Sequence, residues 1–198
     1  MKHTAKKRLI NRIRKKLSGT RGFSLGELLA ATLILLLASQ VLTQGMAFSA
    51  RMYNESLTKS HARQLCSTLT NVIETELRYT TEITVTDNRM TKYFSPSYGK
   101  TESSFAGIDS WGYPADDTTG GEVAIQIKDK DDNFVWQKLL SSASYSSYNL
   151  KAAVRPVTFN EDSNTFKVEL HIIDKDGNNL VTNNFDVIAV NKVIVDRQ

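Results

Sequence analysis

Cysteine, histidine and proline are scarce in this chain of 198 residues, which has one, three and three of them. The single cysteine, Cys66, excludes an internal disulfide framework and a cysteine-rich metal site. The histidines His3, His61 and His171 are far apart, and no pair has the spacing of metal ligands. A phosphate-binding Gly-x-x-x-x-Gly-Lys-Ser/Thr loop is absent, and the Ser-rich stretch 141–147 contains no nucleophile elbow. The sequence therefore predicts no metal site, no cofactor and no enzymatic activity.

Acidic side chains are absent from the N-terminal end, where residues 1–22 carry nine Lys and Arg side chains. The whole chain has a net charge of +4, so residues 23–198 have a net charge of −5, from 16 basic and 21 acidic side chains. Binding of a phosphate backbone requires clustered Lys and Arg. We therefore expect no direct nucleic-acid binding by the main part of the chain.

Charge of either sign is absent from Leu28 to Ala50, a run of 23 mostly apolar residues. A helix of this length would span roughly 34 Å, enough to cross the ~30 Å hydrocarbon core of a bilayer. Lys and Arg near a membrane span favour the cytoplasmic side, and nine of them precede this run, whereas Arg51 and Lys59 follow it. The sequence predicts a single-pass protein of the cytoplasmic membrane, with its N-terminus in the cytoplasm and its C-terminal body translocated.

The residues after this run keep a helical period but become amphipathic. Apolar side chains recur mostly at steps of three and four residues, with polar side chains between them. Proline is absent before Pro96, so we expect one continuous helix from about Phe23 to Tyr79. Cys66 lies on the apolar stripe, which favours a small buried side chain over a reactive thiol. The predicted stripe consists of Leu57, Leu65, Leu69, Val72, Ile73 and Leu77.

The pattern changes from helix to strand at Glu82. Alternation of apolar and polar side chains is clearest at Thr165–Ile173, and residues 95–121, rich in Ser, Gly, Thr and Asp, are predicted to form a long loop. The sequence predicts an α+β fold, in which a long N-terminal helix packs on a C-terminal antiparallel sheet of about four to six strands. The expected strands are Glu82–Val85, Glu122–Lys128, Asn133–Leu140, Ala152–Phe159, Thr165–Ile173 and one or two within Leu180–Val195.

Two loop features leave alternatives open. The segments Asp129–Asn133 and Asp174–Asn178 share the pattern Asp-Lys-Asp-x-Asn, in which oxygen-bearing side chains alternate as in a calcium-binding loop. In a calcium-binding loop that begins at Asp174, however, the position expected to be glutamate is Phe185. We expect plain turns there, with calcium binding as the alternative. The side chains of Trp111 and Tyr113 are expected to fold back over the sheet, and an adhesive or carbohydrate-binding tip is the alternative.

The junction between the basic segment and the apolar run carries the most specific motif. Its sequence is Gly22-Phe23-Ser24-Leu25-Gly26-Glu27, followed by two leucines. Over about residues 15–50 the chain resembles the processing site of type IV pilins and pseudopilins. Gly26 is a departure, because the family usually has a branched apolar residue there. The resemblance implies that a prepilin peptidase cleaves after Gly22 and methylates the new amino group of Phe23. It also implies that Glu27 meets the N-terminus of a neighbouring subunit during assembly.

A physical argument, independent of this resemblance, also explains an acidic residue at Glu27. A carboxylate in an apolar segment costs up to about 2.5–3.5 kcal/mol at mid-membrane, and less near the interface. Such a group persists where a partner compensates its charge, and cleavage after Gly22 would create a partner in the amine of Phe23. The alternative is that Glu27 only marks the cytoplasmic edge of the membrane span.

The chain is thereby divided into a leader peptide (1–22), a transmembrane and filament-core helix (23–50), an amphipathic helix (51–79) and an extracytoplasmic β-rich domain (80–198). We expect a structural subunit of a type IV pilus or pseudopilus, located in an extracellular filament after assembly. Its expected partners are a prepilin peptidase, other pilin or pseudopilin subunits, a membrane assembly platform and the lipid bilayer. Motility or adhesion, secretion and DNA uptake all remain open as its role.

The alternative is a membrane-tethered or secreted binding protein with an unrelated extracellular β domain. In its secreted form, a signal peptidase would cleave after Ala47-Phe48-Ser49. Against this alternative, the apolar run is longer than the 7–15 residues that are typical of a secretory signal.

Overall fold

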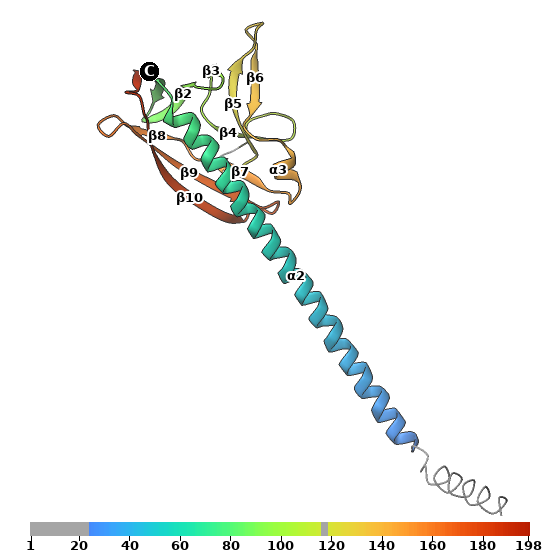
Figure 1. Ribbon diagram of the computed structural model, residues 1–198. Coiled ribbons are helices and arrows are strands. Elements are labelled where there is room, and N and C mark those ends of the chain that lie inside the picture. Colours follow the sequence, from blue (N-terminus) through green and yellow to red (C-terminus); the bar gives the residue numbers. More distant parts are fainter. Residues whose placement is uncertain (1–23, 116–118) are drawn as a thin grey trace, which may run out of the picture. The chain divides into compact units, whose positions relative to one another are not determined.

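The structure, a computed structural model, describes residues 24–115 and 119–198 (Figure 1). The predicted leader 1–22 and Phe23 therefore lie outside the described residues. The chain separates into two compact units, one ending at Tyr53 and the other comprising Asn54–Gln198. The helix α2, Leu25–Arg78, contributes residues to both units.

The long helix α2 confirms the main prediction for the N-terminal half of the chain. It begins at Leu25 and ends at Arg78, close to the expected limits. In the described part of the first unit, residues 24–53, every residue is exposed. Gly45 does not interrupt the helix. Near its N-terminus α2 is long and apolar enough to cross a membrane, as the charge-free run predicts.

In the second unit, α2 buries one stripe of side chains. The buried positions follow one another mostly at steps of three and four residues, as expected for one face of a helix. Leu57 and Val72 are only half-buried, whereas Ala62 and Glu76, which do not belong to the predicted stripe, are buried. The buried residues of α2 are Ala62, Leu65, Cys66, Leu69, Ile73, Glu76 and Leu77.

The first sheet has the strand order β11-β1-β2-β3. β1 and β2 are joined by Asp87 and Asn88, whose φ angles of 51° and 61° are those of a two-residue hairpin turn with both residues left-handed. β2 has no counterpart among the predicted strands. β11 lies parallel to β1, so this sheet is mixed. The strands are β1 (Glu82–Thr86), β2 (Arg89–Ser95), β3 (Gly99–Lys100) and β11 (Ile194–Arg197).

Two antiparallel sheets accompany the first one, where a single sheet was expected. One has the order β10-β9-β7, with β8 also pairing with β9, and the other has the order β4-β5-β6. The predicted strand Ala152–Phe159 is divided around Pro156, because proline has no N–H to donate to a neighbouring strand. The strands are β4 (Ala106–Ile108), β5 (Glu122–Lys128), β6 (Phe134–Lys138), β7 (Lys151–Val154), β8 (Thr158–Asn160), β9 (Thr165–Ile173) and β10 (Asn179–Ile188), and the short helix α3 is Ala143–Ser146.

The core of the second unit joins α2 to these sheets. Leu69 and Ile73 of α2 are fully buried in one cluster with Ile125 of β5 and Leu170 of β9. Tyr145 of α3 accepts a hydrogen bond of 3.1 Å from the N–H of Val123, and burial raises the pKa of this tyrosine to about 12. The expected α+β arrangement, a long helix packed on antiparallel strands, is therefore confirmed.

Candidate functional site at the start of α2

Three residues carry the predicted processing and assembly site, and the structure describes one of them. Gly22 and Phe23 lie outside the described residues. Glu27 lies in the first turn of α2 and is exposed. A negative charge is favourable there, because the free N–H groups of a helix start carry a partial positive charge.

Ser24 and Glu27 form a reciprocal pair of hydrogen bonds at the start of α2. The N–H of Ser24 donates to Glu27 Oε2 at 3.0 Å, and the N–H of Glu27 donates to Ser24 Oγ at 3.2 Å. This capping box satisfies backbone donors that have no partner inside the helix. Ser24 has no role among the predicted site residues, although Ser-x-x-Glu ahead of an apolar run is the sequence signal of such a cap.

The capping box also orients the carboxylate of Glu27. Its Oε2 lies 3.0 Å from the peptide nitrogen through which Ser24 is joined to residue 23. The carboxylate is therefore turned toward the N-terminal end of the helix rather than along its apolar side. An amine created by cleavage after Gly22 would be one residue away from that nitrogen in the chain.

Three hydroxyl groups within the charge-free run form hydrogen bonds to carbonyls of their own helix. Thr32 Oγ1 donates to the carbonyl of Leu29 at 2.9 Å, and Ser39 Oγ donates to the carbonyl of Leu36 at 2.8 Å. Thr43 Oγ1 forms the same kind of bond, at 2.9 Å, with a carbonyl one turn earlier. Polar groups need an internal partner inside a bilayer, where no water is available. These three side chains are therefore compatible with a membrane span.

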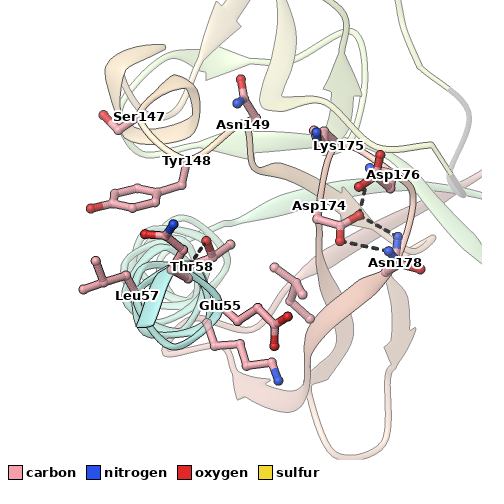
Figure 2. A pocket seen from close by; sticks show the side chains of 13 residues that line it. Glu55, Leu57, Thr58, Ser147, Tyr148, Asn149, Asp174, Lys175, Asp176 and Asn178 are labelled. Atoms are coloured by element: carbon pink, nitrogen blue, oxygen red, sulfur yellow. Dashed lines mark hydrogen bonds between the residues drawn. The ribbon is translucent and has the colours of Figure 1, made fainter. Parts of the chain in front are cut away.

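The second unit contains a groove of about 790 Å³, lined by α2, the segment after α3 and the β9–β10 hairpin (Figure 2). In this groove, the Asp174 carboxylate accepts hydrogen bonds from the backbone N–H groups of Asp176 and Asn178 and from the Asn178 side chain, at 2.8–3.0 Å. These bonds, foremost the one from the Asn178 side chain, lower the pKa of Asp174. Tyr148, on the opposite wall, stacks on His61 with ring centroids 3.8 Å apart. The Asp174 carboxylate and the Thr58 hydroxyl are already hydrogen-bonded within the chain, and we assign no chemistry to the groove.

Both Asp-rich segments form hydrogen-bonded turns, as expected. Asp129 Oδ1 accepts the N–H groups of Asp131 and Asn133 at 2.9 Å, in the same way as Asp174 in its own turn. In the described ranges, no three His, Cys, Asp or Glu side chains gather closely enough to hold a metal ion.

Two expectations for single side chains have opposite outcomes. Cys66 is buried and burial raises the pKa of its thiol, so the prediction of a small buried side chain is confirmed. Trp111 and Tyr113 are 84% and 70% exposed, so the prediction that they fold back over the sheet is wrong. The turn that carries them directs both side chains into solvent.

The residues Gly22–Gly26 also match the letters Gly-x-Ser-x-Gly of a nucleophile elbow. An elbow places its serine between a strand and a helix, with a histidine as base. Here Ser24 Oγ accepts a hydrogen bond from the backbone of Glu27 as part of a helix cap. The serine therefore has the surroundings of a cap and not those of a nucleophile.

Comparisons with protein-family models, with curated proteins and with solved structures found no match for this chain.

Proposed function

We propose that this chain is a structural subunit of a type IV pilus or pseudopilus, cleaved after Gly22 and methylated on Phe23. The observation that carries the proposal is the start of α2. There a basic segment and the Gly22-Phe23 pair precede a capped acid, Glu27, and a charge-free helix that is exposed along its whole length.

The exposed helix supports self-association as the activity of the chain. Large apolar side chains such as Leu35 and Val41, 69% and 70% exposed, have no partner inside their own unit among the described residues. Such a surface is stable only in lipid or against other apolar helices. Exchange of lipid contacts for helix contacts has little hydrophobic cost, so the same segment can anchor the free subunit and form a filament core.

Glu27 supplies the specificity of this association. A filament core of apolar helices needs a polar contact that sets the register of one helix against the next. In the proposed assembly, the Glu27 carboxylate pairs with the methylated amine of Phe23 of a neighbouring subunit, and removal of the basic leader exposes that amine.

The orientation follows from the charge distribution, and the partners follow from the resemblance to type IV pilins. The nine cations ahead of the span keep the leader in the cytoplasm, where a membrane-embedded prepilin peptidase reaches Gly22. The second unit is translocated and displayed on the filament. Other pilin or pseudopilin subunits and a membrane assembly platform are the remaining partners.

Co-expression of the full chain with a prepilin peptidase tests the processing step. We expect a loss of mass that corresponds to residues 1–22, and an added methyl group on Phe23. A Gly22→Ala variant should insert into the membrane equally well and stay uncleaved. Cleavage after Ser49, or an intact leader in the presence of active peptidase, would contradict the proposal and support a secreted or tethered binding protein.

A further inference from the structure

Three turns of the second unit share one hydrogen-bonding pattern. In each, the Oδ1 atom of an aspartate accepts the backbone N–H groups of the residues two and four positions later, at 2.8–2.9 Å. The N–H of the aspartate donates to the carbonyl of the fifth residue at 2.8–3.0 Å, and the fourth residue has a φ between 64° and 85°. The turns are Asp109–Tyr113, Asp129–Asn133 and Asp174–Asn178.

The side chains that these turns present are very different. Two of the turns carry Asp at the third position and Asn at the fifth, whereas the turn after β4 carries Trp111 and Tyr113. Because the polar turns form the same hydrogen bonds, the backbone of this turn does not require aromatic residues. Trp111 and Tyr113 also add little to the core, since most of their surface stays in water. Both rings are therefore available for contact with another molecule.

The turn that carries these rings is attached to a rigid part of the fold. The N–H of Ala115 donates to the carbonyl of Gly107 in β4 at 2.7 Å, so both ends of the turn are fixed. β4 is in turn closely packed, because a Cβ atom on Gly121 would lie 2.2 Å from the carbonyl oxygen of Ile108. Two backbone hydrogen bonds of 2.8–2.9 Å connect Gly121 to Ala152. A preformed surface of this kind loses little conformational freedom when it binds.

The charge around the turn restricts the kind of ligand. Among the described residues from Thr101 to Ile127, the carboxylates of Glu102 and Glu122 are paired with Lys92 and Lys138, at 2.6 and 2.5 Å. These acids are therefore compensated within the chain, and the described surroundings of the turn favour a neutral ligand over an ionic one. The carboxylate of Asp109 is directed into the turn by its two backbone bonds, and it is not presented as a partner for a cation. The interaction left for the side chains of Trp111 and Tyr113 is stacking on an uncharged ring of a ligand. We infer that Trp111 and Tyr113 form a binding platform for a neutral polysaccharide, whose sugar rings pack their C–H faces on the aromatic faces.

This site belongs to the second unit and does not depend on the proposed filament. Its test uses the full chain in detergent, mixed with microcrystalline cellulose, insoluble chitin and insoluble mannan. The variant Trp111→Asp/Tyr113→Asn gives the turn the same third and fifth residues as Asp174–Asn178. The control Phe134→Ala removes an exposed aromatic ring at the start of β6. Tryptophan fluorescence, to which Trp136 also contributes, gives the dissociation constant of the unmodified chain for soluble oligomers of the same sugars. The bound fraction in sedimentation gives the affinity of the double variant, which lacks Trp111.

We expect the full chain to sediment with at least one of the three polysaccharides, and its tryptophan emission to shift to the blue on binding. The double variant should keep its melting temperature and bind at least about tenfold more weakly, as expected for the loss of two stacking contacts. Phe134→Ala should bind as the unmodified chain does. Absence of sedimentation with all three polysaccharides, or equal binding by the double variant, would overturn the inference. So would a double variant whose only defect is in binding to lipid vesicles or to other copies of the chain.

Discussion

At the scale of single residues, Glu27 has one role that the structure shows and a second that we propose. Its carboxylate completes the capping box with Ser24, which needs only an oxygen acceptor. The proposed pairing with a neighbouring amine needs a negative charge as well. A glutamine at this position keeps the acceptor and removes the charge, so the two roles can be tested apart.

We predict that Glu27→Gln and Glu27→Ala are both inserted and cleaved, and that both are incorporated poorly into filaments. The alanine variant also loses a helix cap, worth about 1 kcal/mol. The measurement is the ratio of subunit in the sheared filament fraction to subunit in the membrane, by immunoblot. If the glutamine variant is incorporated as well as the natural chain, Glu27 acts as a cap and not as a charged partner.

Glu76 is a buried acid that fixes the end of β2 to α2. It is 4% exposed, and its carboxylate accepts hydrogen bonds from the hydroxyls of Ser95, Ser97 and Tyr93. We predict that Glu76→Ala lowers the free energy of unfolding by about 2–4 kcal/mol, because three hydroxyls lose their acceptor. Glu74→Ala, two residues away, removes only a partly exposed pair with Arg78 and should cost at most about 1 kcal/mol. Equal effects of the two variants in urea denaturation would contradict this role of Glu76.

Cys66 gives a pH-dependent probe of the same region. Burial raises the pKa of its thiol above the ordinary value of 9.0, so the folded chain holds the proton when the unfolded chain has released it. The corresponding stability is present below pH 9 and decreases as the pH rises toward the pKa of the folded state. We predict very slow alkylation by iodoacetamide in the folded state at pH 8 and rapid alkylation in urea. Comparable rates in both conditions would show that the thiol is accessible.

At the scale of elements, periodicity made the long elements predictable. α2, β5 and β9 have a regular repeat over 7 residues or more, and the structure places them close to the predicted limits. β3 and β4 have two and three residues, which is too short for any repeat. The predicted run Leu180–Val195 is divided into β10 and β11 because its last residues leave β9 and pair with β1. That change of partner depends on contacts between distant residues, which a local pattern does not contain.

The two parts of α2 should respond differently to the same substitution. Leu69 is fully buried in the second unit, whereas Leu37 is 59% exposed in the first. We predict that Leu69→Ala lowers the free energy of unfolding of the body by about 2–5 kcal/mol, because it opens a cavity in the core.

Leu37→Ala is the matched control, and it should leave the melting temperature of the body in detergent unchanged. Circular dichroism of the two variants in one detergent makes the comparison. A large loss of stability for Leu37→Ala would mean that this leucine packs on the body and is not free for lipid or neighbouring helices.

At the scale of the whole molecule, most residues of the candidate site are predicted from the sequence, and few are found only from contacts in the structure. Gly22, Phe23 and Glu27 are predicted site residues because the junction resembles the processing site of type IV pilins and pseudopilins. The geometry adds Ser24 as the cap that orients Glu27. Trp111 and Tyr113 were assigned to the sheet surface because aromatic residues are usually buried, and only the turn geometry places them in solvent.

The mass of the N-terminal peptide of this chain, isolated from filaments sheared off the cell surface, tests the proposed function most directly. We predict a peptide that begins with N-methylated Phe23, from a subunit present in the same particles as other subunits with the same type of N-terminus. A chain that begins at Met1 or Ala50, or that is found only in the membrane or as a free monomer, would contradict it.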